Sequence, residues 1–141
     1  MGRLAEQDRA NFAYERVRQH SQHADAGEYR QLVRGLPAMT QQCGLGQTMA
    51  FLASKAEWID GNVNLHHRKP KNEFAMALVD LEKWLRQFPF AQGKDGVLKA
   101  LMDGDSRSYH MATTEALAYL QWLKRFAEAA IEKPERETVR G

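Results

Sequence analysis

The stretch QQCGLGQTMAFLASKAEW, residues 41–58, decides the fold, because two closely spaced glycines precede an apolar helical segment. Phosphate-binding loops of nucleotide-binding proteins also carry closely spaced glycines before a helix. However, a Walker loop needs G-x-x-x-x-G-K-[ST] after a strand, and this stretch has neither the preceding strand nor the lysine. The dinucleotide fingerprint also fails, since Met49 stands at its third glycine. We therefore interpret the stretch as a corner between two helices. Gly44 is expected in the left-handed position that ends the first helix, and Gly46 lets the second begin against it.

Helical periodicity extends in both directions from this corner. Near the N-terminus, Ala10, Ala13, Tyr14 and Val17 share one face of a helix expected over residues 4–20. Pro37 predicts that residues 29–35 and 37–43 form separate or kinked helical pieces. Further helices are expected at 45–58, 73–88, 97–102 and about 106–132. Because alternating β-branched residues are absent, we predict an all-α fold, a single compact bundle of about six or seven helices.

The last of these segments is predicted to be the central helix. Its apolar residues sweep more than half of the helix circumference, which is wider than one packing stripe. The narrow remaining face gathers Arg107, His110, Thr114, Gln121 and Arg125. At roughly 1.5 Å rise per residue, this polar ridge would be about 27 Å long.

Length and composition point to one domain without a membrane span. The chain has 141 residues, of which 43% are apolar, enough for one core. We expect a single helical domain over 1–141, with frayed tails at 1–3 and 133–141 and a surface loop at 60–72. No apolar run approaches the roughly 18 residues of a membrane span. The single Cys43 excludes an internal disulfide framework and suits the reducing cytosol, so the expected location is cytoplasmic.

Candidate metal and catalytic sites in the sequence are incomplete. His66 and His67 are adjacent and diverge, while His20 and His23 lack a clear third ligand, so no metal is expected. The D-x-N-x-N pattern that begins at residue 60 lacks the glycine and the glutamate of a calcium loop. We interpret MDGDSRSY, residues 102–109, as a helix-capping turn and not an acid–base pair. We therefore predict a protein that is not an enzyme and needs no cofactor.

Two segments carry a family resemblance. YRQLVRGLPAMTQQCGLGQTMAFLASK (29–55) has a tyrosine helix, a Leu-Pro corner, then Gly-Leu and Gln before an apolar helix that ends in lysine. SRSYHMATTEALAYLQWLKRFAEAA (106–130) has Thr-x-Glu-Ala-Leu, a tryptophan and a basic-aromatic-alanine ending. Together they resemble the small helical subunit family of the type III-B CRISPR-Cas (Cmr) RNA-targeting effector complex. Cys43 departs from the pattern, where the family more often has asparagine.

The resemblance implies a non-catalytic subunit that stacks in a few copies into a minor filament. Its implied partners are the backbone and large subunits of the Cmr complex, other copies of itself, and the duplex of target RNA with guide RNA. Two other interpretations stay open: the small subunit of the type III-A complex, and a free-standing helical adaptor that binds protein.

A subunit that contacts RNA from one side needs cations placed to meet phosphates, while base pairing reads the sequence. The candidate RNA-binding residues are Arg16, Arg18, Arg30, Arg34, Lys55, Arg107, Lys124 and Arg125.

Overall fold

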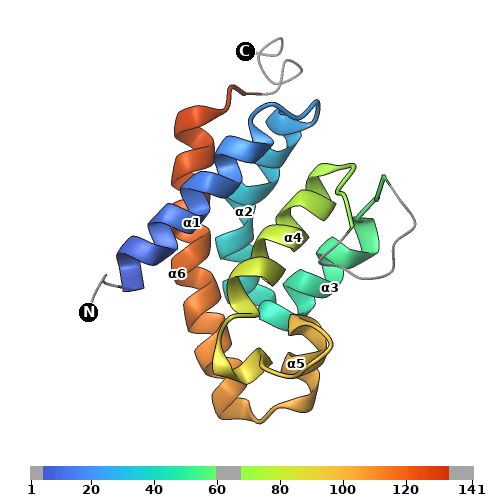
Figure 1. Ribbon diagram of the computed structural model, residues 1–141, viewed down its shortest axis with the longest axis vertical. Helices are drawn as coiled ribbons and strands as arrows, with labels where there is room; N and C mark the ends of the chain where they lie inside the picture. Colours follow the sequence, from blue (N-terminus) through green and yellow to red (C-terminus); the bar gives the residue numbers. More distant parts are fainter. Residues whose placement is uncertain (1–4, 60–67, 134–141) are drawn as a thin grey trace.

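Six α-helices and one short 3₁₀-helix make up the part of the chain that this computed structural model describes, residues 5–59 and 68–133 (Figure 1). The prediction of an all-α bundle is confirmed, since the only β-type pairing among these residues is an isolated bridge between Trp58 and Pro70. The elements are α1 (Ala5–His20), α2 (Ala26–Cys43), α3 (Leu45–Lys55), α4 (Glu73–Leu85), η2 (Pro89–Ala91), α5 (Val97–Asp103) and α6 (Ser106–Ala130).

Some predictions fall on residues outside the described ranges. The predicted tails and most of the predicted loop coincide with residues 1–4, 60–67 and 134–141, which the structure does not describe. The end of that loop is described. There Asn72 begins α4, and its side chain accepts a hydrogen bond from the N–H of Ala75.

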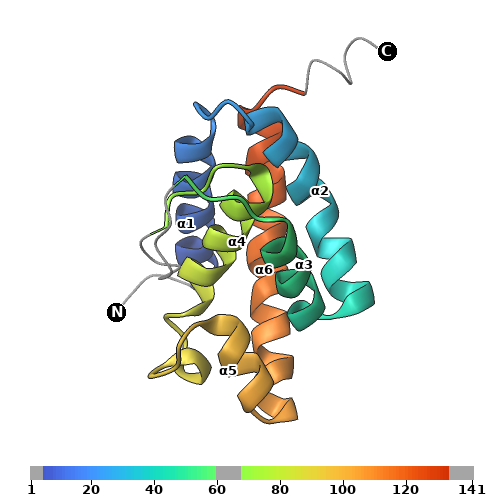
Figure 2. The same cartoon turned by 90° about the vertical axis from the view of Figure 1, so that its right-hand side faces the viewer.

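Helix α6 runs along most of the molecule, with α1 and α2 packed against it (Figures 1 and 2). Helices α3 and α4 pack against α2, and α5 lies beside the start of α6 (Figure 2). The inner faces of these helices supply the largest fully buried side chains, which are Val17, Tyr29, Leu36, Leu45, Met49, Leu52, Met76, Leu81, Leu85, Tyr119, Leu120 and Leu123. Burial of this apolar surface is the main favourable term for the fold.

The Gly44 corner between α2 and α3 is confirmed, with one correction to its geometry. Gly44 has φ 90° and ψ 158°, so φ is positive as predicted, but ψ places it outside the left-handed helical region. Its N–H donates to the carbonyl oxygen of Thr40 and closes α2, while its own carbonyl accepts from the N–H of Thr48 and opens α3. Because only glycine adopts this backbone region readily, one residue can both end α2 and begin α3.

Separate helical pieces on the two sides of Pro37, one of the two predicted alternatives, are not observed. Helix α2 continues through Pro37, which is buried together with Leu36 and Thr40. A proline inside a helix removes one backbone hydrogen bond and costs about 3 kcal/mol in an exposed helix. Here the packing of α2 against α6 and α4 holds the helix in one piece, so tertiary contacts override the local preference.

Asp80 in α4 joins three helices at a buried polar cluster. Its carboxylate accepts hydrogen bonds from Arg16 Nε at 2.7 Å and from Tyr29 Oη at 2.5 Å, and His20 Nε2 lies 2.8 Å from Asp80 Oδ1. Burial alone would raise the pKa of Asp80, but His20, Arg16 and the hydrogen bonds outweigh it and hold that pKa below its ordinary value. The cluster fixes α1 and α2 onto α4.

Candidate nucleic-acid interface

The outward face of α6 is the most extended polar surface that the sequence predicted. Asp105 begins the helix, because its side chain accepts a hydrogen bond from the N–H of Ser108 at 2.8 Å. The five residues predicted to share one face are all exposed: Arg107, His110, Thr114, Gln121 and Arg125. We call this face the α6 ridge, and its position on the solvent side of the bundle is confirmed.

The ridge carries uncompensated positive charge. The acidic residues within α6, Glu115 and Glu128, both pair with arginines of neighbouring helices. By contrast, Arg107 and Arg125 on the ridge, and the partly exposed Lys124 at its edge, have no ion pair with any residue in the described part of the chain. The cations of α6 are therefore free to meet an anionic partner.

The neutralising arginines come from both sides of α6. Arg9 of α1 holds Glu115 with two hydrogen bonds, of 2.7 Å and 2.9 Å, and Trp84 Nε1 donates to the same carboxylate at 2.9 Å. Arg34 of α2 pairs with Glu128 at 3.0 Å. A carboxylate held in this way contributes little negative field beyond its partner, so α1 and α2 set the charge of the ridge.

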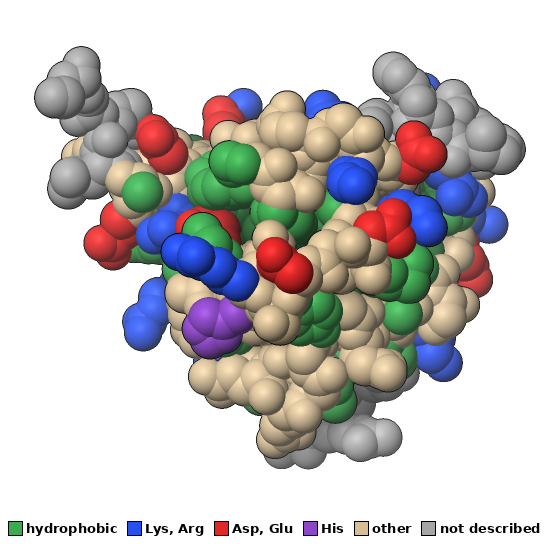
Figure 3. Space-filling model, turned by 90° about the horizontal axis from the view of Figure 1, so that it is seen from below, with side chains coloured by type: hydrophobic (Ala, Val, Ile, Leu, Met, Phe, Trp, Pro, Cys, Tyr) green, Lys and Arg blue, Asp and Glu red, His purple; other side chains and the backbone are tan. Residues whose placement is uncertain are grey.

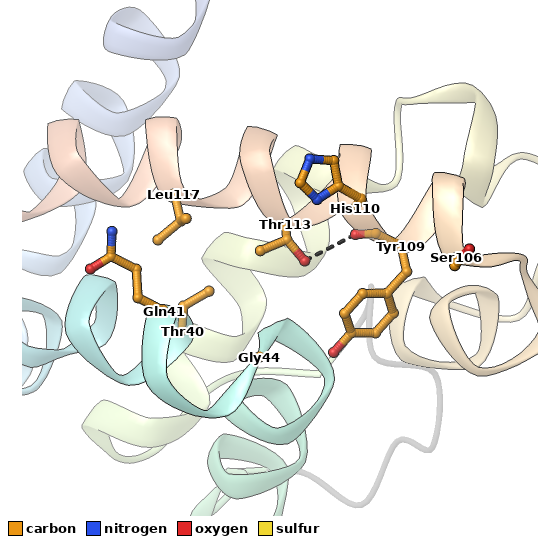
Figure 4. A pocket seen from close by; sticks show the side chains of 8 residues that line it. All are labelled: Thr40, Gln41, Gly44, Ser106, Tyr109, His110, Thr113 and Leu117. Atoms are coloured by element: carbon orange, nitrogen blue, oxygen red, sulfur yellow. Dashed lines mark hydrogen bonds between the residues drawn. The ribbon is translucent and has the colours of Figure 1, made fainter.

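A hollow of about 500 Å³ lies beside the ridge, between the end of α2 and the first half of α6 (Figure 4). Figure 4 shows the ring of Tyr109 pointing from α6 toward the Gly44 corner. There Tyr109 Oη accepts a hydrogen bond from the N–H of Gly46 at 2.8 Å. The hydroxyl of Thr113 donates to the carbonyl oxygen of Tyr109, so it is already engaged. The lining residues are Thr40, Gln41, Gly44, Ser106, Tyr109, His110, Thr113 and Leu117.

The end of the molecule near α5 has a different surface. Figure 3 views it from below and shows side chains of both charges dispersed among apolar ones, with no continuous basic patch in this view. The positive charge of the ridge is therefore not continued across this end of the molecule.

The structure brings together only part of the predicted basic set. Arg107, Lys124 and Arg125 lie on α6, and Arg34 of α2 reaches the last turns of α6, where it pairs with Glu128. Lys55 is the last residue of α3, which lies across the molecule from α1 in Figure 1.

The arginines of α1 and the first part of α2 are engaged or buried. Arg18 is exposed and paired with Glu15 at 2.8 Å. Arg16 is not the surface cation that the sequence predicted, because its side chain is 10% exposed and is paired with Asp80. Arg30 is 8% exposed, and its Nε and Nη1 atoms are buried without a hydrogen-bond partner.

The Asp80 cluster was missed by sequence reasoning, although a signal for it was present. In EFAMALVDLEKWL, residues 73–85, an aspartate interrupts an almost continuous apolar run. A carboxylate in a helix buried on most of its faces needs a cation or several donors nearby. The partners could not be read locally, because Arg16 and His20 are 64 and 60 residues away in the chain.

Metal-binding and membrane-spanning features are both missing from the described residues. These residues contain no group of three or more His, Cys, Asp or Glu side chains placed to hold a metal ion. None of their helices is both long and apolar enough to cross a bilayer.

Comparison with known proteins gives consistent matches across nearly the whole chain. The family model described as "CRISPR-associated protein (Cas_Cmr5)" matches residues 5–130. The CRISPR system Cmr subunit Cmr5 of Thermus thermophilus is 32% identical over 124 residues, covering 88% of this chain and 93% of that protein. A crystal structure of a CRISPR-associated Cmr5 family protein from the same organism superposes with a TM-score of 0.67 at 30% identity. It covers 92% of this chain and 100% of the solved one.

Proposed function

The chain belongs to the Cmr5 family, the small subunit of the type III-B CRISPR Cmr complex, and from this premise we propose that its α6 ridge holds target RNA against the guide RNA. Copies of the subunit would stack into the minor filament and present successive ridges to the paired strands. Family membership decides the choice left open by the sequence in favour of the type III-B subunit over a free-standing adaptor. The observation that supports the RNA-holding role is the set of cations on α6 that form no ion pair with any described residue.

The geometry of the ridge suits a backbone contact. Arg107 and Arg125 stand near its two ends, separated by about 27 Å at the rise of an α-helix. His110, Thr114 and Gln121 lie between them. The side chains of His110 and Gln121 can donate hydrogen bonds to phosphate or ribose oxygens, whereas the Thr114 hydroxyl already donates to the carbonyl oxygen of His110. Contacts of this kind position a nucleic acid without reading its sequence, which agrees with a complex in which the guide reads the target by base pairing.

One subunit offers few phosphate contacts, so the proposal predicts weak RNA binding by the free chain. In an assembled filament, the second and later contacts are intramolecular, and their effective concentration raises the overall affinity without any new kind of contact. In that setting each copy would contribute the three α6 cations that have no ion pair among the described residues, Arg107, Lys124 and Arg125.

A non-catalytic role is consistent with the two carboxylates that most resemble an acid–base pair. Asp103 pairs with Lys99 at 3.3 Å. Asp105 caps α6, and the hydrogen bond from the N–H of Ser108 holds the pKa of Asp105 below its ordinary value. A general acid working near neutral pH needs a raised carboxyl pKa, so Asp105 is not prepared for that role.

The test is charge reversal on the ridge within the assembled complex. The variant Arg107→Glu, Lys124→Glu, Arg125→Glu should weaken target RNA binding. The salt dependence of log K should become shallower by about 2 to 3 per subunit copy, since each lost phosphate contact removes a slope of about 0.9. Guide loading should be unchanged. Binding is measured across a salt series on complexes whose composition has been verified.

A matched control reverses three exposed lysines away from α6, with Lys69→Glu, Lys71→Glu and Lys94→Glu. It changes the net charge by the same amount, so it separates the ridge from a general electrostatic effect. If the ridge variant fails to assemble while intact complexes keep wild-type RNA affinity, the α6 ridge is a protein interface and the proposal is wrong.

A further inference from the structure

An aromatic cluster occupies the flank of the α6 ridge that faces α1. The Trp122 and Phe126 rings stack with centroids 5.6 Å apart and planes 24° from parallel. Tyr14 of α1 meets the edge of Phe126 at 5.6 Å, with the planes at 79°. We call Tyr14, Trp122 and Phe126 the aromatic platform.

The side chains of the aromatic platform are partly exposed to solvent. Helical spacing placed Tyr14 on the buried face with Ala13 and Val17, but in the structure Tyr14 is 51% exposed while the other two are buried. Trp122 and Phe126 pack against the core from its edge and are only partly buried. Aromatic side chains left open beside one another on a surface mark a site for a ligand with an apolar face.

The charges around the platform favour an anionic ligand. Arg125 is adjacent to Phe126 in the chain, lies on the exposed ridge, and has no ion pair among the described residues. The nearby carboxylates are already neutralised, since Glu15 pairs with Arg18 and Glu128 pairs with Arg34. A planar ring joined to phosphates, a nucleotide, combines the apolar face and the negative charge that this surface fits.

We propose that the aromatic platform stacks an unpaired base of the target RNA, while Arg125 holds a phosphate next to that base. This inference rests on the proposed function and specifies it further. In a duplex, each base is covered on both faces by its neighbours, so protein aromatics reach only bases that are unpaired and unstacked. The platform therefore engages target nucleotides that are not paired with the guide, and the rest of the ridge follows the backbone.

The test uses the reconstituted complex with guide RNA and a target RNA that carries a single 4-thiouridine, moved position by position. Irradiation should cross-link the probe to peptides containing Tyr14 or Trp122 at unpaired target positions and not at paired ones. Trp122→Leu should abolish the Trp122 cross-link. It should also weaken target binding by about five- to tenfold, the lower range for loss of one stacked base.

Two further variants make the result interpretable. A melting curve shows whether Trp122→Leu destabilises the fold. If it does, Tyr14→Ser still tests the platform, because Tyr14 is the more exposed side chain. Phe51→Leu is the matched control, because it disrupts another edge-to-face aromatic pair, with Phe74, between α3 and α4. It should leave both the cross-links and the target affinity at wild-type levels.

The outcomes separate this inference from the proposed function. If charge reversal on the ridge weakens RNA binding while platform variants change neither affinity nor cross-links, the ridge binds RNA and the platform does not. If neither set of variants affects RNA, both proposals fail. If no 4-thiouridine position cross-links to Tyr14 or Trp122 and the platform variants prevent assembly of the complex, the platform is a protein interface and the inference is overturned.

Discussion

Replacing Asp80 with asparagine should destabilise the bundle more than any surface substitution. The asparagine keeps the shape of the side chain but removes its charge. The Arg16 guanidinium then stays largely buried without a counter-charge, and the two groups that approach Asp80 Oδ1, Arg16 Nε and His20 Nε2, lose their anionic acceptor. Tyr29 Oη, which donates to Asp80 Oδ2, would face either a neutral oxygen or an amide nitrogen.

The expected loss of unfolding free energy is about 3 to 5 kcal/mol, the usual cost of removing one partner from a buried ion pair. Domains of this kind are stable by roughly 5 to 15 kcal/mol, so the change is a large fraction of the total. At about 2 to 4 °C per kcal/mol, the melting temperature should fall by on the order of 10 °C. Thermal and urea unfolding at pH 7 measure it, and Asp95→Asn, an exposed control, should change stability by less than about 0.5 kcal/mol.

The same substitution predicts a pH dependence whose sign follows from the pKa of Asp80. That pKa is lowered in the folded state, so the carboxylate contributes stability fully above its unfolded pKa of about 3.9. This contribution is lost as pH falls through the folded pKa. The stability difference between wild type and Asp80→Asn should therefore be largest near neutral pH and shrink in acid. Equal melting temperatures at pH 7, or a difference that stays constant into strong acid, would contradict a stabilising role for the Asp80 charge.

Further predictions concern the corner and the chemistry. Gly44→Val should cost on the order of 1 to 3 kcal/mol, because φ is 90° and a Cβ would lie 3.0 Å from Tyr109 Oη. The control Gly35→Ala, whose Cβ meets nothing within 4 Å, should stabilise α2 by about 0.5 to 1 kcal/mol in the same melting assay. The purified chain should cleave no RNA with magnesium, manganese or zinc. Metal-dependent cleavage that disappears in the double variant Asp103→Asn, Asp105→Asn would contradict the non-enzyme assignment.

Features with a local cause were predictable from the sequence. The positions of the helices followed from the 3.6-residue period. The corner between α2 and α3 was predictable because a positive φ is a local backbone property that favours glycine, and Gly44 has one. The start of α6 followed from the helix-capping turn predicted at residues 102–109, in which Asp105 caps the helix. Pro37 shows the limit of such rules, because a local penalty of about 3 kcal/mol can be offset by packing along a whole helix.

Features that depend on partners distant in the chain were not predictable. The sequence contains Arg16 and Arg125 as equivalent basic residues on amphipathic helices. Only the folded arrangement makes Arg16 a buried counter-ion of Asp80 and leaves Arg125 exposed. A helical wheel gives the direction of a side chain relative to its own helix, but whether that direction meets solvent or a carboxylate depends on the neighbouring helices.

The charge on the outward face of α6 depends on the neighbouring helices as well as on α6 itself. Counted by itself, the helix has nearly balanced charges, with Arg107, Lys124 and Arg125 against Glu115 and Glu128. Arginines of α1 and α2 occupy both carboxylates, so the uncompensated cations become the dominant charge of its outward face. The packing of α1 and α2 thus contributes to stability and, through these two ion pairs, also creates the basic surface proposed to meet RNA. Substitutions at this packing surface can therefore alter RNA affinity without any contact to RNA.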